Sequence, residues 1–175
     1  MKRNTAATWA AALLAGPLLA ACGGLDEDII CQPVVGSGAV ISRAPGTEVE
    51  DDGRAYDQSL SSSAEMFTLS GEGSATFRVS SRQPGGRVVG VLLGMPAGQV
   101  TTVDIRATSE GEVVRSGRAG TQSDSSQVCA GTCVQSNGLT FFGLRVDSAF
   151  DALEATIGVT GTTASTRVHE LCARS

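Results

Sequence analysis

The chain has 175 residues, and 13 Lys and Arg against 18 Asp and Glu give it a formal net charge of −5. So acidic a chain lacks the basic surface that phosphate binding requires, which excludes nucleic acid as a partner. Its only lysine is Lys2, so a P-loop lysine, a Schiff base and a Ser-Lys dyad are excluded from the rest of the chain.

The N-terminus has the pattern of an export signal. Lys2 and Arg3 form a short positive segment, and residues 10–19 are nearly all Ala and Leu. This apolar run is too short to span about 30 Å of hydrocarbon at about 1.5 Å per residue, so it predicts a signal-peptide core and not a spanning helix. It ends in the sequence Leu19-Ala20-Ala21-Cys22.

Residues 1–24 resemble the signal of bacterial lipoproteins, with Leu19-Ala20-Ala21-Cys22 as the lipobox. The resemblance implies that residues 1–21 are a cleaved signal peptide and that Cys22 carries a thioether-linked diacylglycerol, with acyl chains such as palmitate. Several chains anchor stably at about 0.8 kcal/mol per buried methylene. It also implies a cell-envelope location, in the outer membrane if the host has one, facing periplasm or exterior. An ordinary signal peptide, or an uncleaved anchor with an incidental cysteine, is the alternative.

The remaining cysteines predict a disulfide-linked body. Residues 22–30 are expected to be a short tether and residues 31–175 a single domain, whose four cysteines suit two disulfides in an exported protein. Four cysteines allow three connectivities. Cys129 and Cys133 flank a three-residue connection that can close a hairpin, which favours that pair and leaves Cys31 with Cys172. A four-thiolate zinc site is the alternative.

The body is expected to be all-β. From Val34 onward, short runs rich in Val, Thr, Phe and Ile are separated by Gly, Ser and Pro, and no segment has the helical pattern over three turns. About eight to ten strands, spaced by about ten residues, suit a two-sheet antiparallel sandwich of jelly-roll or immunoglobulin-like type. The pattern leaves the topology undetermined.

The first strand is expected over residues 34–41, with a bulge or a close backbone approach at Gly36-Ser37-Gly38. Residues 43–64 then lack apolar rhythm and carry clustered acids, so a long solvated loop is expected. Ca²⁺ binding by these acids is an alternative, but the ligand spacing of an EF-hand loop is lacking.

The middle of the chain has the clearest strand pattern. Residues 75–80 alternate apolar and polar, and a hairpin is expected between them and residues 67–69. Residues 88–93 are apolar throughout and are expected to be a central strand covered on both faces. Residues 100–107 alternate again and predict a half-buried strand.

The last third is less regular. A short edge strand is expected at residues 113–114, followed by a second long polar loop at residues 116–127. The phase of apolar residues changes near Phe141-Phe142, which predicts a bulge there. Residues 155–159 predict another strand, and the phase change over residues 168–172 requires either a bulge or burial on both faces.

The sequence contains few residues or motifs suited to catalysis or ligand binding. The chain lacks G-x-S-x-G, H-E-x-x-H and Gly-rich phosphate motifs, and its one histidine, His169, falls in an expected strand where a structural role is the simpler interpretation. Glu110 and Glu112 could act as an acid–base pair at a glycosidic bond, but a solvated turn is the simpler interpretation. No catalytic residue, metal ligand or cofactor is assigned. Tyr56 is the one aromatic residue expected to be exposed as an interaction site.

These observations predict a lipid-anchored, non-catalytic envelope domain that acts in protein interaction or envelope assembly, through the loops at residues 43–64 and 116–127. Its partners would be the membrane, through Cys22, and an envelope protein or glycan. A glycan-binding or hydrolytic domain is the alternative function.

Overall fold

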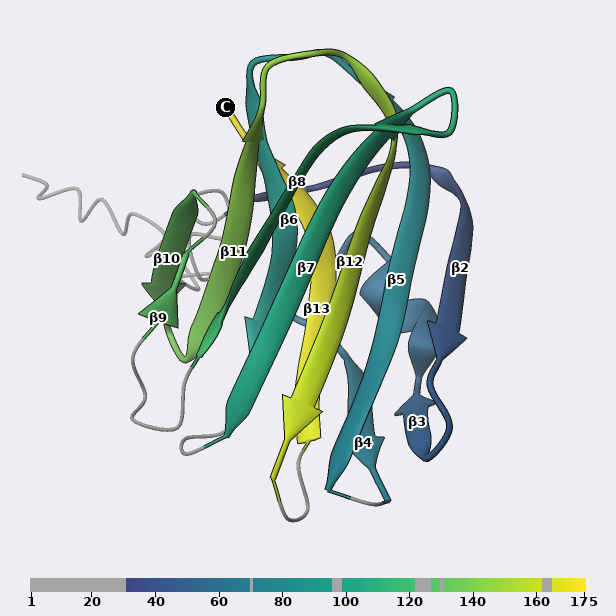
Figure 1. Ribbon diagram of the computed structural model, residues 1–175, viewed down its shortest axis with the longest axis vertical. Helices are drawn as coiled ribbons and strands as arrows, with labels where there is room; N and C mark the ends of the chain where they lie inside the picture. Colours follow the sequence, from purple (N-terminus) through teal and green to yellow (C-terminus); the bar gives the residue numbers. More distant parts are fainter. Residues whose placement is uncertain (1–30, 70, 96–98, 122–126, 130, 162–164) are drawn as a thin grey trace, which may run out of the picture.

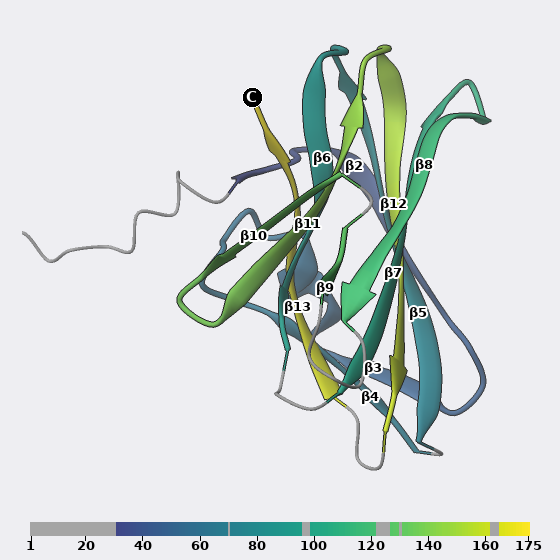
Figure 2. The ribbon, with the colours of Figure 1, turned by 60° about the vertical axis from the view of Figure 1, so that its left-hand side comes forward.

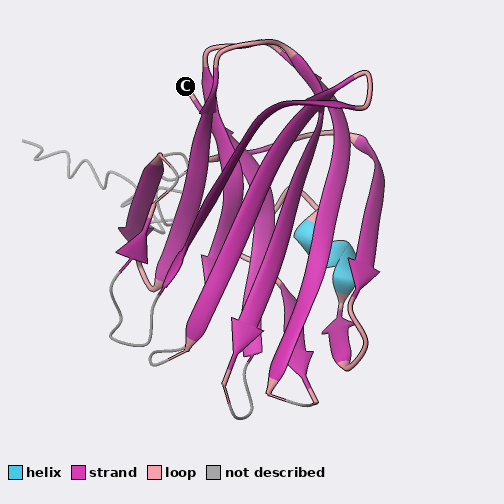
Figure 3. Cartoon of the chain, in the orientation of Figure 1, coloured by secondary structure: helices cyan, strands magenta, loops and turns pink. Residues whose placement is uncertain are grey.

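A computed structural model describes residues 31–175 of the chain except 70, 96–98, 122–126, 130 and 162–164 (Figure 1). The expected signal peptide, Cys22 and the tether therefore lie outside the described residues. Within them the chain is almost entirely strand (Figure 3), and no helix there is long and apolar enough to cross a membrane. The elements are β1 Gln32–Pro33, β2 Ser37–Arg43, β3 Thr47–Glu50, the 3-10 helix η2 Asp52–Ala55, β4 Ala64–Thr68, β5 Glu72–Gln83, β6 Arg87–Gly94, β7 Val100–Ser109, β8 Glu112–Thr121, β9 Gln127–Val128, β10 Thr132–Ser136, β11 Leu139–Val146, β12 Phe150–Thr160 and β13 Ser165–Arg174.

The strands form two antiparallel sheets that face one another (Figure 2). Sheet A has the order β10-β11-β6-β13-β4-β3, with β1 paired to the C-terminal half of β13. Sheet B has the order β2-β5-β12-β7-β8-β9. The predicted fold class, a two-sheet antiparallel sandwich, is confirmed, and these orders supply the topology that the sequence pattern leaves open.

The main core lies between the two sheets. Alternate residues of each strand point inward because successive side chains of a strand face opposite ways. Sheet B contributes buried side chains from β5, β7 and β12, and sheet A from β6, β11 and β13. The largest of them are Phe77, Ile105, Phe150, Leu153, Ile157, Leu93, Phe142, Leu144 and Leu171.

A second, smaller apolar cluster covers the outer face of sheet A. It consists of Cys31, Leu60, Leu92, Phe141 and Cys172. Strand β6 is therefore buried on both faces, as its continuous apolar run predicts. The bulge expected at Phe141-Phe142 is wrong, because β11 pairs with β6 without a register shift. Phe142 faces the main core and Phe141 the second cluster, so the phase change reflects burial on both faces.

Bulges occur in β2 and β13. In β2 the register shifts between Ser37 and Val40, and a Cβ on Gly36 would collide with the backbone carbonyl of Ser80. The expected bulge and close approach are both present. In β13, Val168 pairs with Leu93 and Glu170 with Leu92, which makes His169 the extra residue.

Two predicted hairpins are wrong. Strand β4 pairs with β13 and β3 in sheet A, whereas β5 pairs with β12 and β2 in sheet B, so the chain crosses between the sheets after β4. The same is true of the cysteine segment. Strand β9 extends sheet B and β10 extends sheet A, so the Cys129–Cys133 disulfide spans a crossing between sheets and does not close a hairpin.

Both expected long loops contain regular elements. Residues 43–64 include β3 and η2. Strand β3 buries Thr47 and Val49 alternately, but its four residues are too short a run to stand out in the sequence. Strand β8 continues to Thr121, through half of the second expected loop. Its side chains are mostly exposed, so it shows no apolar alternation. Residues 122–126 lie outside the described residues.

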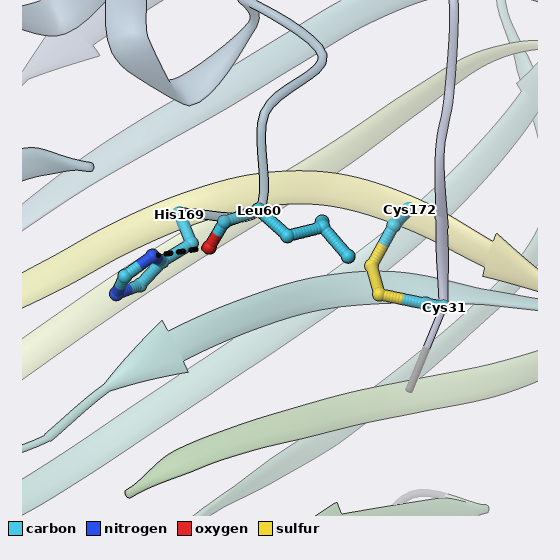
Figure 4. The surroundings of a disulfide bond; sticks show 4 residues. All are labelled: Cys31, Leu60, His169 and Cys172. Atoms are coloured by element: carbon cyan, nitrogen blue, oxygen red, sulfur yellow. Dashed lines mark hydrogen bonds between the residues drawn. A yellow bond between two sulfur atoms is a disulfide. The ribbon is translucent and has the colours of Figure 1, made fainter. Parts of the chain in front are cut away.

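The predicted disulfide pairing is confirmed. Cys31 bonds Cys172 across 141 positions, with 5.6 Å between their Cα atoms, and Cys129 bonds Cys133, with 5.8 Å. Cys31 directly precedes β1, which pairs with the end of β13. Figure 4 shows Leu60 beside the Cys31–Cys172 bond, where its side chain belongs to the second apolar cluster.

Candidate functional site

The outer face of sheet B is an uncovered polar surface. Ala75, Phe77 and Val79 of β5 point into the core, so Thr76 and Arg78 between them point outward. The same alternation applies to β12 and β7, and Figure 1 shows no described element in front of these three strands. The register of the sheet then decides which outward side chains are neighbours.

Directly opposed residues place the outward side chains in three rows that run across the sheet. Rows are two residues apart, or about 6.6 Å along the strands. We call this surface the polar face. Across β5, β12, β7 and β8 its first row is Arg78, Glu154 and Arg106, its second is Thr76, Thr156, Asp104 and Arg118, and its third is Ser74, Gly158 and Thr102. On the edge strand β2, the exposed Val40 and Ser42 flank the first and second rows.

The second row combines a closed ion pair with two hydroxyl groups. Arg118 donates from Nε to Asp104 Oδ1 at 2.8 Å and from Nη2 to Oδ2 at 3.0 Å, a bidentate arrangement. These hydrogen bonds raise the pKa of the Arg118 guanidinium. Beside the pair, the Oγ1 atoms of Thr76 and Thr156 are 2.8 Å apart. Each hydroxyl keeps acceptor capacity for a ligand.

The first row has two arginines and one carboxylate. Nη1 of Arg106 lies 3.8 Å from Oε1 of Glu154, a loose ion pair. Arg78 lies directly opposite Glu154 on the other side of β12. Its guanidinium forms no ion pair with any carboxylate in the described part of the chain. The row thus offers donors that the fold does not use.

The third row borders an open hollow of about 330 Å³. Gly158 is part of its lining, where a Cβ would be 2.5 Å from Oγ1 of Thr102. Backbone and small side chains form its floor. Its lining comprises Ala44, Pro45, Glu72, Gly73, Ser74, Thr102, Gly158, Val159 and Thr160.

The polar face can donate and accept many hydrogen bonds but cannot stack on a ring. Guanidinium groups only donate, carboxylates only accept, and hydroxyls do both. None of the residues in the three rows is aromatic. The surface therefore suits a ligand rich in hydroxyl groups, held by hydrogen bonds across neighbouring strands.

His169 and Glu170 meet on the opposite side of the molecule, beneath residues 57–62. His169 is 7% exposed, and its Nδ1 lies 3.0 Å from the carbonyl oxygen of Leu60 (Figure 4). Its buried Nε2 has no hydrogen-bond partner among the described residues. Glu170 is 1% exposed and accepts a 3.0 Å hydrogen bond from the backbone N–H of Gln58. Burial lowers the pKa of His169 and raises that of Glu170 to about 8. Covered in this way, neither group can reach a bound substrate.

Tyr56 is not the exposed residue that its polar surroundings predict. Its ring is half-buried, 6.4 Å from the ring of Phe77, and its hydroxyl donates to the carbonyl oxygen of Val40 at 3.2 Å. The same hydroxyl accepts a 3.0 Å hydrogen bond from the backbone N–H of Arg78. Burial is the main reason that its pKa is raised. Tyr56 therefore joins β2 to β5 beside the bulge, with its hydroxyl engaged both as donor and as acceptor.

Other candidates do not assemble into a site. Glu110 and Glu112 lie at the β7–β8 turn, where Glu110 has φ 53° and its backbone N–H donates to Asp151. All four described cysteines are in disulfides. Within the described ranges, no group of three or more His, Cys, Asp or Glu side chains is arranged to hold a metal ion.

Sequence reasoning identified the outward positions of the polar face but not the face itself. The alternation over residues 75–80 and 100–107 indicates that Thr76, Arg78 and Asp104 point to solvent. It carries no signal that Arg78 faces Glu154, 76 positions later. A feature that could draw attention to this surface is Gly158 inside an otherwise regular strand.

No family model and no curated protein matches the chain. Solved structures similar to it include TmCBM61 in complex with beta-1,4-galactotriose, at 13% identity and TM-score 0.46 over 81% of this chain and 90% of that one. A chitosan-binding module from a Paenibacillus chitosanase/glucanase is similar at 16% identity and TM-score 0.43, over 81% of this chain and 97% of that one. A structure of carbohydrate-binding modules of the β-sandwich superfamily is similar at 11% identity and TM-score 0.47, over 79% and 57%. At these values the likeness is one of fold alone.

Proposed function

We propose that this protein is a lipid-anchored module of the cell envelope that binds a glycan, without catalysis, on the polar face of sheet B. The observation that carries the proposal is the polar face itself. Three rows of unlike hydrogen-bonding groups lie on a rigid, uncovered sheet, next to an open hollow. Sugars present many hydroxyl groups that both donate and accept, which this mixture matches.

The chemistry of the polar face favours a glycan over a protein partner. The centre of a protein interface is usually built on aromatic and large apolar anchors. The three rows contain none, and one exposed apolar side chain, Val40, flanks them. Their residues are Arg, Asp, Glu, Thr, Ser and Gly. Protein interaction or envelope assembly through the two expected loops has less support, because both segments contribute strands or the 3-10 helix η2 to the fold.

A face without aromatic stacking is expected to bind a single sugar chain weakly. Membrane anchoring offsets weak binding, since many copies held in one plane engage a polymeric glycan at high effective concentration. The acyl chains expected on Cys22 would supply that anchoring, in the outer membrane if the host has one. A short tether would keep the module close to the bilayer.

The anchor has its own test. Cys22→Ser removes the thiol that would be acylated, so the variant should lose incorporation of labelled fatty acid and leave the membrane fraction. Cys31→Ser is the matched control, because its thiol is expected in a disulfide, and it should remain acylated. A Cys22→Ser protein that still incorporates the label would overturn the anchor.

Glycan binding is tested by calorimetry with the mature protein in mild detergent and oligosaccharides released from envelope polysaccharides. Asp104→Asn disrupts the bidentate pair with Arg118 and should weaken binding about tenfold, as expected for a hydrogen bond to a charged group. Asp147→Asn is the matched control, because Asp147 forms a similar 2.9 Å pair with Arg145 away from the polar face. Equal binding by both variants would overturn the site, and binding to no glycan would overturn the function.

A further inference from the structure

The first row of the polar face has two arginines but only one carboxylate. Arg78 and Arg106 lie on either side of Glu154, on the strands that flank β12. Glu154 pairs with Arg106 at 3.8 Å, which leaves Arg78 without an anionic partner among the described residues. Neighbouring carboxylates cannot fill this role. Both oxygens of Asp104 are engaged by Arg118, and Asp52 pairs with Arg43 at 3.2 Å.

This excess of positive charge stands out in an acidic chain. The net charge is −5, yet the three rows contain three arginines and two carboxylates. Acidic side chains gather instead on the far edge of sheet A, where Glu50 and Glu65 are directly opposed on β3 and β4. Arg78 is exposed on β5, next to the edge strand β2, and has no anionic partner within the described part of the chain, so it is positioned to meet an anion from outside.

The fold holds Arg78 firmly at its backbone. Its N–H donates to the hydroxyl of Tyr56 at 3.0 Å, and its Cα is paired with Val40 on one side and Glu154 on the other. Only the side chain is free to move. The fixed backbone means that only side-chain freedom is lost on binding, and the planar fork of the guanidinium matches a carboxylate through two parallel hydrogen bonds.

We propose that the glycan bound on the polar face is acidic and that Arg78 binds its carboxylate, with Arg106 contributing from across Glu154. This inference rests on the proposed function and names the ligand class of that site. The sugar hydroxyls would then meet Thr76 and Thr156 in the second row and the hollow beside Gly158 in the third, about 13 Å along the strands. An anionic membrane is a poorer match, because polybasic lipid sites use clusters of four to eight cations.

The test compares a uronic-acid oligosaccharide with its carboxyl-reduced, neutral counterpart, using calorimetry on the full mature protein at two salt concentrations. Wild-type protein should prefer the acidic sugar about tenfold at low salt, and the preference should fall as salt rises because the pair is exposed. Arg78→Gln should lose the preference but still bind the neutral sugar. Arg78→Lys should retain part of it, since it keeps the charge and loses the fork.

Arg145→Gln is the matched control, because Arg145 is an exposed arginine away from the polar face and should leave the preference unchanged. Circular dichroism checks that every variant is folded. Equal binding of both sugars by wild-type protein, or a preference that survives Arg78→Gln, would overturn the acidic ligand while leaving glycan binding intact. Binding of neither sugar would overturn the proposed function as well. Binding to phosphatidylglycerol vesicles that Arg78→Gln abolishes, without sugar binding, would replace the glycan by a membrane surface.

Discussion

The carboxyl group of Glu170 accepts a 3.0 Å hydrogen bond from the backbone N–H of Gln58, which lies 112 positions earlier in the chain. This contact fastens residues 57–62 over the outer face of sheet A. Burial raises the pKa of Glu170 from 4.5 to about 8, and the negative charge of Asp57 adds to the shift. The fold thus favours the protonated carboxyl at neutral pH.

Glu170→Gln should make the stability of the protein less dependent on pH. Because the folded pKa is above the unfolded one, the stabilisation from protonated Glu170 is complete below about pH 4.5 and is lost as the pH rises through about 8. Urea unfolding should therefore show wild-type protein losing a few kcal/mol between pH 4.5 and 9, and the variant losing less. Glu48→Gln on exposed β3 is the control. Parallel pH profiles for Glu170→Gln and wild type would contradict the buried-carboxyl account.

The two disulfides should differ in their accessibility to reductant and in their contribution to the free energy of unfolding. Cys31 and Cys172 are buried whereas Cys129 is exposed, so mild reductant should open Cys129–Cys133 first. In the chain-entropy model the 141-residue separation stabilises by about 5 kcal/mol and the four-residue separation by about 2 kcal/mol. Replacing both cysteines of each pair by serine and comparing urea unfolding tests this order. A larger loss from the Cys129–Cys133 pair would contradict it.

Tyr56→Phe should destabilise the fold without affecting glycan binding. The variant keeps the ring against Phe77 but leaves the Val40 carbonyl and the Arg78 N–H without the bridging hydroxyl. A loss of about 1–3 kcal/mol is expected by thermal unfolding. Sugar affinity, measured by calorimetry below the unfolding range, should stay unchanged. A drop in affinity with unchanged stability would instead support Tyr56 as an interaction residue.

Glu50→Lys should stabilise the protein slightly. Glu50 and Glu65 are exposed and directly opposed on β3 and β4, and like charges in that position repel. Reversing one charge should increase stability by about 0.2–1 kcal/mol, an effect that salt reduces. Chemical unfolding at low and high salt measures it. In the background of Glu65→Gln the gain should largely disappear, and a gain that persists there would locate its cause elsewhere.

Local features of the fold were predictable where one strand carries its own signal. The alternation of residues 75–80 and the apolar run of residues 88–93 follow directly from burial on one face or on two. The cysteine pairing followed from an even count and a short spacing. Strand partners were not predictable, since β4 and β5 are neighbours in sequence yet lie in different sheets.

The candidate site was likewise predictable within one strand but not between strands. That Arg78 faces solvent could be predicted from its strand, but that it lies opposite Glu154 depends on a register between distant segments. The half-burial of Tyr56 was not predictable, because its neighbours in sequence are polar whereas its neighbours in space are Phe77 and β2. His169 is buried because residues 57–62 fold over β13. No local sequence pattern predicts that contact.

The Cys31–Cys172 bond also has a mechanical meaning. A pull on the chain ahead of Cys31 passes through a covalent link into β13, near the middle of sheet A, and bypasses the two-residue pairing of β1. Strand β13 is held by β6 along one edge and by β4 along the other, so the load is shared among parallel rows of hydrogen bonds in shear. The bulged junction of β2 with β5 lies in the other sheet, away from this point of entry. Tension on the N-terminal side therefore enters the sandwich through sheet A, the layer opposite the polar face.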